Sequence, residues 1–267
     1  MSSLEHAAPR RRLASTFVLA SITLAALDLV FPALCPVCHA ILGAGRRDPL
    51  CGTCWSAITR LDVPWCDTCG AAPALSPASA DPRQIAHGRS CAACEAAPPS
   101  YDYARSAAVY EGQLREALHA LKFSGRRALA APLGELAAEQ CLAALPAGID
   151  ALIPVPLAPE RERERGFNQA ALLARRIGRR LAVPTRPRWL ARIRPTRPQS
   201  ELSAGERRAN VRGAFRASRR VAGRHVLVVD DILTTGATVD ACARALRDAG
   251  AQRVGVLTVA RVLHAAV

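Results

Sequence analysis

The clearest pattern of apolar and polar positions lies near the C-terminus. HVLVVDD at 225–231 is a continuous apolar run that ends in two acids, which is typical of a strand buried on both faces of a parallel sheet. After the turn at 232–236, apolar residues at helical spacing predict a helix that stops at Gly250, and 254–260 predicts the next strand. Strand, helix and strand form a right-handed crossover unit, in which ligands bind beyond the carboxyl ends of the strands.

The same periodicity predicts the elements that precede this unit. Helical patterns cover roughly 112–122 and 128–145, and another helix is expected from 168 to about 181. The remaining segments are strands at 151–156 and around 188–191, and a long loop with a short helix at 192–212. We therefore expect an α/β fold, in which a Rossmann-like parallel sheet has helices on both faces.

Two shorter segments are expected before this domain, which we place at 100–267. Residues 1–31 contain a basic triplet and then an apolar stretch at 13–27, the outline of an export signal. No convincing cleavage site of small residues follows, and the apolar run breaks at Asp28, which makes it too short for a transmembrane span. We predict a helix that packs on the protein or lies on a membrane surface. Residues 32–99 form a cysteine-rich module.

Composition adds two constraints. At 267 residues the chain can hold one sizeable domain and one small one, and its 50% apolar content excludes disorder throughout. Its formal charge of +14 comes almost entirely from arginine, because Lys122 is the only lysine. Arginine binds phosphates and carboxylates through a bidentate fork. Charge alone does not distinguish a nucleic acid from a small polyanion such as a sugar pyrophosphate.

Eight of the ten cysteines form C-x-x-C pairs, a spacing that suits metal ligation in a reducing compartment and therefore a cytoplasmic protein. Tetrahedral zinc takes two such pairs, so we predict two structural zinc ions; redox-active or unpaired thiols are the alternative. The predicted ligands are Cys35, Cys38, Cys51, Cys54, Cys66, Cys69, Cys91 and Cys94.

The order of the pairs bears on how they combine. CPVCHAIL and CDTCGAAP look like first knuckles and CGTCW and CAACE like second knuckles, which favours two successive ribbons over an interleaved cross-brace. Cys141 and Cys242 lie in helical patterns and are expected in the core. His39 is a further potential ligand, but eight available thiolates favour a surface position for it.

The turn after the C-terminal acidic strand has the features of a phosphate site. A loop that leads from a strand into a helix presents unpaired amides and the positive end of the helix dipole to an anion. The predicted 5′-phosphate ligands are Thr234, Thr235, Gly236, Ala237 and Thr238. Asp230 and Asp231 would repel a phosphate, so they are expected to accept hydrogen bonds from sugar hydroxyls and to favour Mg²⁺ or positive charge at the sugar carbon.

VLVVDDILTTGAT at 226–238 resembles, at every position, the phosphoribosyl-pyrophosphate (PRPP) signature of type I phosphoribosyltransferases. The alternative is an ordinary strand end with a polar turn. IPVPLAPERERERGFNQ at 153–169 resembles the pyrophosphate loop of these enzymes, with Arg163 as a further cation. A solvated charged helix is the alternative for the arginines. This resemblance implies a pyrophosphate loop that contains Pro154, Val155, Pro156, Arg161 and Arg165.

The segment 194–215 lies where type I enzymes place a mobile hood, which excludes water from the reaction. Its candidate residues are Arg194, Thr196, Gln199 and Arg208. With RGFNQ at 165–169, the R-x-T-x-x-Q-x-x-L run at 194–202 and the cysteine pairs, the chain resembles the ComF family (ComFC or GntX type) from Phe31 onward. That family is associated with DNA uptake in competent bacteria.

LKFSGR at 121–126 also matches that family, which makes Lys122 a candidate phosphate ligand; an exposed lysine at a helix end is the alternative. The resemblance implies a cytosolic phosphoribosyltransferase-like domain with a connection to single-stranded DNA or the DNA-uptake machinery. Three hypotheses follow: an enzyme that transfers phosphoribosyl from PRPP with Mg²⁺, a sensor of PRPP or a nucleotide, and a DNA-handling protein. The low aromatic content disfavours the third, and the acceptor and oligomeric state stay open.

Overall fold

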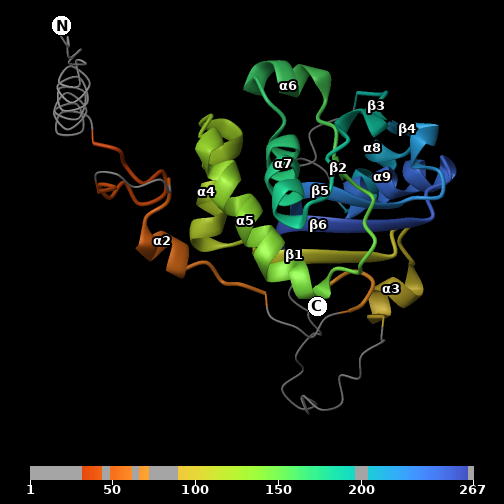
Figure 1. Ribbon diagram of the computed structural model, residues 1–267, viewed down its shortest axis with the longest axis horizontal. Helices are drawn as coiled ribbons and strands as arrows, with labels where there is room; N and C mark the ends of the chain where they lie inside the picture. The colour runs from red at the N-terminus through yellow and green to blue at the C-terminus, as the bar shows by residue number, and fades with distance from the viewer. Residues whose placement is uncertain (1–31, 44–48, 62–65, 72–89, 196–203, 264–267) are drawn as a thin grey trace, which may run out of the picture.

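The computed structural model describes residues 32–43, 49–61, 66–71, 90–195 and 204–263 (Figure 1). The helix predicted within 1–31 lies outside these residues, so its contact with protein or membrane stays a prediction. Within the described ranges, no helix combines the length and the apolar character needed to cross a bilayer.

A four-stranded parallel sheet forms the centre of the described C-terminal part, in the order β1-β6-β5-β2. Its strands are β1 (Tyr103–Val109), β2 (Ala151–Pro154), β5 (His225–Leu233) and β6 (Arg253–Arg261). The first five residues of β5 are buried, as expected for a central strand covered on both faces. The predicted parallel sheet is therefore confirmed, and β5 and β6 place their carboxyl ends at one edge.

Helices cover one face of this sheet: α4 (Gly112–Phe123), α5 (Ala130–Cys141) and α7 (Gln169–Leu181). Their buried leucines share one apolar cluster with Leu227 of β5 and Leu257 of β6. The helix predicted at 128–145 is divided, because α5 is flanked by the 3-10 turns Arg127–Leu129 and Leu142–Ala144.

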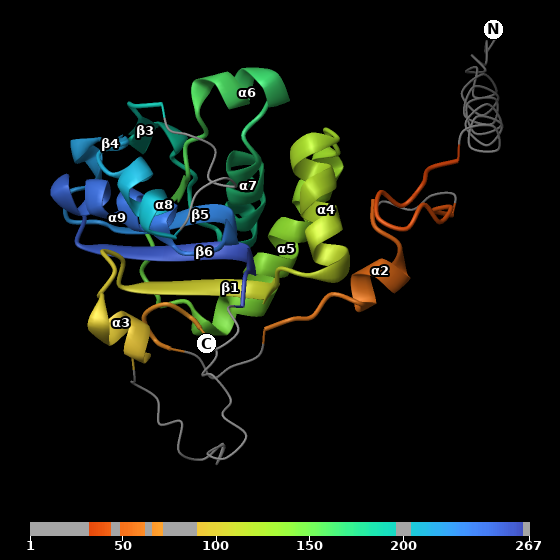
Figure 2. The same ribbon diagram turned by 180° about the vertical axis from the view of Figure 1, so that it is seen from behind.

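The other face packs against α9 (Ala237–Asp248) and α8 (Ala204–Val211). A small antiparallel pair, β3 (Leu190–Arg192) and β4 (Phe215–Ala217), lies beside them (Figure 2). Val239 and Leu246 of α9 join Val228 and Val254 of the sheet in a second apolar cluster. The sheet is therefore buried between two layers of helices. The shorter helices are α2 (Gly52–Ser56), α3 (Ala92–Ala96), α6 (Pro159–Arg165) and the 3-10 turns Pro187–Trp189 and Arg219–Val221.

The cysteine-rich module covers the outer edge of β1. The Val109 N–H donates to the Thr59 carbonyl (2.9 Å), and the Ala104 N–H donates to the Thr68 carbonyl (2.7 Å). Gly70 has a left-handed φ of 67°, and a Cβ there would lie 2.4 Å from the Ala104 carbonyl oxygen, so only glycine fits. The module thereby pairs a strand edge that would otherwise be open to association.

Candidate functional site

A cavity of about 390 Å³ opens where β2 and β5 end. Its walls come from the loop after β2, from α6, from the last turn of α4, and from the segment between β5 and α9. This is the position at which ligands bind in open parallel sheets. The two acids and the loop predicted as a phosphate site both line it.

The phosphate loop, residues 234–238, connects β5 to the N-terminus of α9. Gly236 precedes the helix with a φ of 77°, a conformation that other residues adopt at a cost. Thr234, Ala237 and Thr238 line the cavity, whereas Thr235 turns its hydroxyl towards the Ala237 N–H at 3.5 Å. The loop therefore presents helix N-terminal amides and hydroxyls to the cavity, as an anion requires.

Asp230 and Asp231 lie next to this loop at the end of β5. The Asp231 N–H donates to Asp230 Oδ1 (2.9 Å), and both acids line the cavity. Burial raises the pKa of the Asp230 carboxyl well above its ordinary range, and the Asp231 charge adds to the effect while Lys122 opposes it. Proximity of two acids at one open strand end favours a ligand with hydroxyl groups or a cation.

Lys122 reaches this acid pair from the last turn of α4. Its ammonium lies 2.5 Å from Asp231 Oδ2, and the two side chains are 17% and 5% exposed. An exposed lysine at a helix end would be solvated, whereas this one points into the cavity. The ammonium is thus within reach of an anion bound beside the acids.

Arginines form a basic wall of the same cavity. Arg161 and Arg165 of α6 line the cavity, while Arg163 is 74% exposed and pairs with Glu160 at 3.6 Å. Arg165 donates to Gln169 Oε1 (3.2 Å), and its guanidinium lies 4.9 Å from the centre of the Phe123 ring. Burial, with Arg161 nearby, lowers the pKa of Arg165, but a guanidinium keeps its charge at neutral pH.

The pyrophosphate-loop residues at the end of β2 differ in whether they line the cavity. Pro154 is the last residue of β2, and Val155 and Pro156 continue into the cavity wall. The Val155 N–H donates to the Val229 carbonyl (2.9 Å), which extends the sheet by one residue beside the acids. Asn168 caps α7 and also donates to the Val155 carbonyl (3.0 Å), so the RGFNQ motif fixes the loop from its far side.

The segment predicted as a hood is described at its two ends. Arg194 donates to the carbonyls of Asn210 (3.0 Å) and Arg212 (2.7 Å), so it closes the base of the segment. Thr196 and Gln199 lie outside the described residues, as does the Arg208 side chain, although Arg208 belongs to α8. Their predicted role stays a prediction.

Four polar or aromatic residues of the cavity were not identified from sequence: His119, Phe123, Gln169 and Arg192. Gln169 is the last residue of the RGFNQ motif, so this motif could have identified it as a cavity residue. Arg192 comes from β3, and no local pattern distinguished it from the other arginines. A second cavity of about 550 Å³ shares Lys122, Phe123, Arg161 and Arg165 with the first, and its other lining residues are Gly125, Glu164 and Phe167.

The eight paired cysteines form two separate groups, and the ligand atoms of each group lie within 4.8 Å of one another. The groups are Cys35, Cys38, Cys51 and Cys54, and Cys66, Cys69, Cys91 and Cys94. This grouping agrees with two successive ribbons rather than a cross-brace. Cys141 and Cys242 are buried in the core, and His39 is exposed.

The sulfur positions fit zinc. Zn–S bonds of about 2.3 Å in a tetrahedron set neighbouring sulfurs roughly 3.8 Å apart. The Cys38 and Cys51 sulfurs are 3.4 Å apart, and those of Cys69 and Cys91 are 3.7 Å apart. Main-chain N–H groups also point at the thiols, as the Cys91 N–H does at Cys66 Sγ (3.2 Å). Both groups therefore suit a structural zinc ion.

Comparisons with known proteins agree with the C-terminal domain and with the cysteine-rich module. The phosphoribosyl transferase domain family matches residues 164–266, and the double zinc ribbon domain family matches residues 26–95. DNA utilization protein YhgH of Escherichia coli (strain K12) is 35% identical over 242 residues, which cover 88% of this chain and 100% of that protein.

Two further relatives match in part. Competence protein F of Haemophilus influenzae is 37% identical over 115 residues, 42% of this chain and 50% of that protein. Competence protein ComFC of Bacillus subtilis is 32% identical over 146 residues, 55% of this chain and 58% of that protein. The predicted zinc ribbons and phosphoribosyltransferase-like domain are confirmed.

Proposed function

The chain belongs to the ComF family of competence and DNA-utilization proteins, and from that premise we propose that it binds PRPP and transfers the 5-phosphoribosyl group to an acceptor. In this reaction the bond between ribose C1 and the pyrophosphate oxygen breaks, and its electron pair leaves with pyrophosphate. An acceptor nucleophile forms the new bond to C1 and loses its proton.

The observation that supports this proposal is the juxtaposition of an acid pair with a phosphate loop in one cavity. The 5′-phosphate would take the amides at the start of α9 and the hydroxyls of Thr234 and Thr238. Asp230 and Asp231 would accept hydrogen bonds from the ribose hydroxyls. Their negative charge would also stabilise the positive charge that develops at C1 as pyrophosphate leaves.

The basic wall would hold the leaving group. Arg161 and Arg165 provide guanidinium groups for the pyrophosphate oxygens, and Lys122 is close enough to join them. Binding of a ribose hydroxyl to Asp231 would release Lys122 from its ion pair. The Lys122 ammonium would then bind a phosphate oxygen in place of the Asp231 carboxylate. Ribose and pyrophosphate would then bind cooperatively.

Magnesium fits the same residues, because it binds through one or two carboxylates together with substrate phosphates. Bound with PRPP, it would neutralise the charge that builds up on the departing pyrophosphate. Asp230 and Asp231 would hold it in place, directly or through water.

We also propose the division of the chain into an N-terminal helix at 1–31, a zinc module at 32–99 and a phosphoribosyltransferase-like domain at 100–267. Reduced zinc-binding thiols suit the cytoplasm. A membrane contact of the helix belongs to the same proposal.

Calorimetric titration with PRPP and Mg²⁺ tests the binding step, and the variant Asp230→Asn/Asp231→Asn is the control for the site. We expect the parent to bind PRPP and the double variant to lose at least about tenfold in affinity, because each lost charge-assisted hydrogen bond costs roughly 1–3 kcal/mol. Equal affinity of the two proteins would contradict the role of the acids. Pyrophosphate release with candidate nucleophiles tests turnover, and binding without release would favour a sensor.

The name of the Escherichia coli relative and the arginine-rich composition favour a second candidate function, the handling of DNA, which we propose to be single-stranded. Phosphate contacts make such binding steeply dependent on salt concentration. Fluorescence anisotropy with a labelled single strand at several salt concentrations tests it. Competition by PRPP would place the strand in the same cavity, whereas additive binding would place it elsewhere.

A further inference from the structure

The phosphate loop lies against a segment that leaves the second zinc ribbon, which is formed by residues 66–71 and 90–96. Beyond α3, the Ser100 N–H donates to Asp240 Oδ1 at 2.6 Å, in the first turn of α9. The Tyr101 side chain is buried, and its hydroxyl oxygen lies 3.6 Å from the position of a Cβ on Gly236. Tyr101 therefore supports the turn of the loop from behind.

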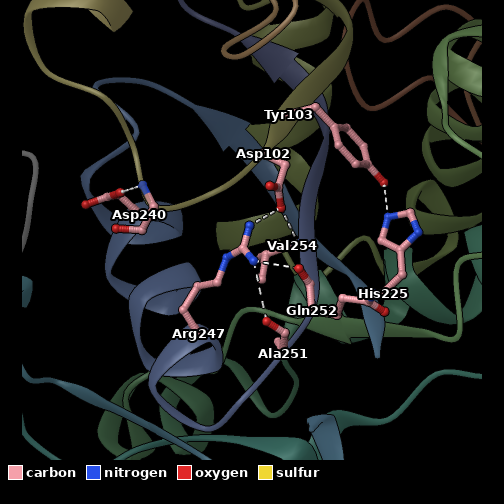
Figure 3. Close-up of polar contacts among 9 residues, drawn as sticks. Asp102, Tyr103, His225, Asp240, Arg247, Ala251, Gln252 and Val254 are labelled. Carbon is pink, nitrogen blue, oxygen red and sulfur yellow. Dashed lines mark hydrogen bonds and ion pairs between the residues drawn. The ribbon is translucent and has the colours of Figure 1, made fainter. Parts of the chain in front are cut away.

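The same segment holds the other end of α9. Figure 3 shows Arg247 between Asp102 and the carbonyls of Ala251 and Gln252. Asp102 also accepts a hydrogen bond from the Val254 N–H at 2.7 Å, which ties it to the start of β6. Both ends of α9 are therefore bonded to the segment that follows the ribbon.

A second connection runs through Arg261, the last residue of β6. Its guanidinium donates to the Cys69 carbonyl and lies 3.8 Å from Cys69 Sγ. In the sheet register Arg261 is the partner of Leu233, and the Val262 N–H donates to the Leu233 carbonyl at 3.0 Å. Leu233 is the residue before the phosphate loop. A zinc ligand is thus linked to the start of the loop through one side chain and one strand pair.

The second ribbon packs closely against β1 of the sheet. Gly70 lies so close to the Ala104 carbonyl that no side chain would fit between them, and the Arg105 guanidinium donates to the Asp67 carbonyl at 2.9 Å. The first ribbon has a different setting: Cys51, Cys54 and Ile58 share an apolar cluster with α4 and α5. The contacts described above come from Cys69 of the second ribbon and from the segment 100–102 that follows it.

We infer that the second zinc ribbon positions the phosphate loop through Tyr101 and Arg261, so that affinity for a 5′-phosphate depends on zinc at this ribbon. The inference rests on the proposed function, because it takes the loop as the 5′-phosphate site. Zinc fixes the two knuckles of the ribbon, and the knuckles fix Tyr101 and Arg261 against 233–236. Loss of the metal would free both supports, and a small displacement of amides that converge on a phosphate weakens all of their hydrogen bonds together.

The experiment compares Cys69→Ser and Tyr101→Ala with Cys38→Ser, a ligand of the first ribbon, by calorimetric titration with ribose 5-phosphate. Cys69→Ser is expected to lose one zinc ion and at least about tenfold in affinity. Tyr101→Ala is expected to keep both ions and still weaken binding by about tenfold. Cys38→Ser is expected to lose one ion and bind within about twofold of the parent. Elemental analysis counts the zinc.

Hydrogen exchange of the amides at 233–240 provides a readout that needs no ligand. Faster exchange in Cys69→Ser and Tyr101→Ala, but not in Cys38→Ser, is expected if the ribbon holds the loop. Parent-like affinity and exchange in Tyr101→Ala would overturn the inference and leave the proposed function intact. A parent protein that does not bind ribose 5-phosphate would overturn both. If Cys69→Ser does not fold, Tyr101→Ala decides.

Discussion

The ion pair between Lys122 and Asp231 allows a quantitative prediction. Its charged atoms are 2.5 Å apart and both side chains are largely buried, so Coulomb's law with an effective dielectric constant of about 20 gives roughly 7 kcal/mol of attraction. Desolvation of both ions offsets most of this attraction, and the net value of the pair is small. Removal of one partner is different, because it leaves the other charge buried alone.

Lys122→Met keeps the apolar stem of the side chain and removes the ammonium. Loss of one member of a buried pair costs about 3–5 kcal/mol, and the residual exposure of this lysine reduces the expected loss to about 2–4 kcal/mol. Asp231→Asn should cost less than about 1 kcal/mol, because it also relieves repulsion with Asp230 and leaves a lysine that water can reach. The double variant should recover most of the loss of Lys122→Met.

Urea unfolding followed by circular dichroism, with zinc present throughout, measures these differences. Arg180→Met is a matched control, because its pair with Glu139 spans 3.9 Å between exposed side chains and should contribute less than about 0.5 kcal/mol. The reasoning is refuted if Lys122→Met is as stable as the parent, or if Asp231→Asn is as destabilising as Lys122→Met. The first result would mean that the cavity is wet enough to solvate a lone carboxylate, and the second would mean that an unpaired Lys122 is as costly as an unpaired Asp231.

Three further predictions concern charge, metal and access. Asp230→Asn should raise the Tm at pH 7 by roughly 2–4 °C, which corresponds to about 1 kcal/mol of relieved repulsion and burial cost. Because the pKa of Asp230 is raised, its carboxyl binds a proton more readily in the folded state, so the parent loses stability as pH rises from about 4. Calorimetry should therefore find no gain in Tm from Asp230→Asn below that pH. The protein should contain about two zinc ions per chain; Cys51→Ser should lose one of them, whereas Cys242→Ser should keep both, as elemental analysis will determine. Since Lys122 is the only lysine, mass spectrometry after reductive methylation should find one modified lysine, and PRPP with Mg²⁺ should slow its modification severalfold.

Sequence periodicity predicted well the elements that follow one another closely along the chain. β5 and α9 follow one another through a short turn, and the apolar run of β5 reflects burial on both faces. β1 was not predicted, because Ser106 interrupts its apolar pattern. That serine is buried only because its hydroxyl lies 2.7 Å from the Thr258 hydroxyl, a partner 152 residues away. A polar pair of this kind is satisfied by tertiary structure and leaves no local signal.

The same contrast between local patterns and tertiary contacts applies to the residues of the site. Asp230, Asp231 and the phosphate loop form one contiguous motif, so their shared position between β5 and α9 could be predicted from the sequence. The 2.5 Å contact between Lys122 and Asp231 joins α4 to β5, and Arg192 enters the cavity from β3. Neither position follows from a local pattern, because helix packing and strand pairing determine both.

The arrangement of charge in the cavity favours one class of ligand over the others. A simple polyanion would be attracted by Arg161 and Arg165 but repelled by the acid pair at the end of β5, so it gains nothing from Asp230 and Asp231. A neutral sugar would suit the acids but would leave the arginines and the N-terminus of α9 without a partner. A sugar with an anionic group at each end would satisfy both sets, because its hydroxyls would meet the acids while its two phosphate-bearing ends would meet the loop and the basic wall. Burial and, after it, the charge of Asp231 raise the pKa of Asp230, and hydroxyl donors or a cation bound there would stabilise its ionised form.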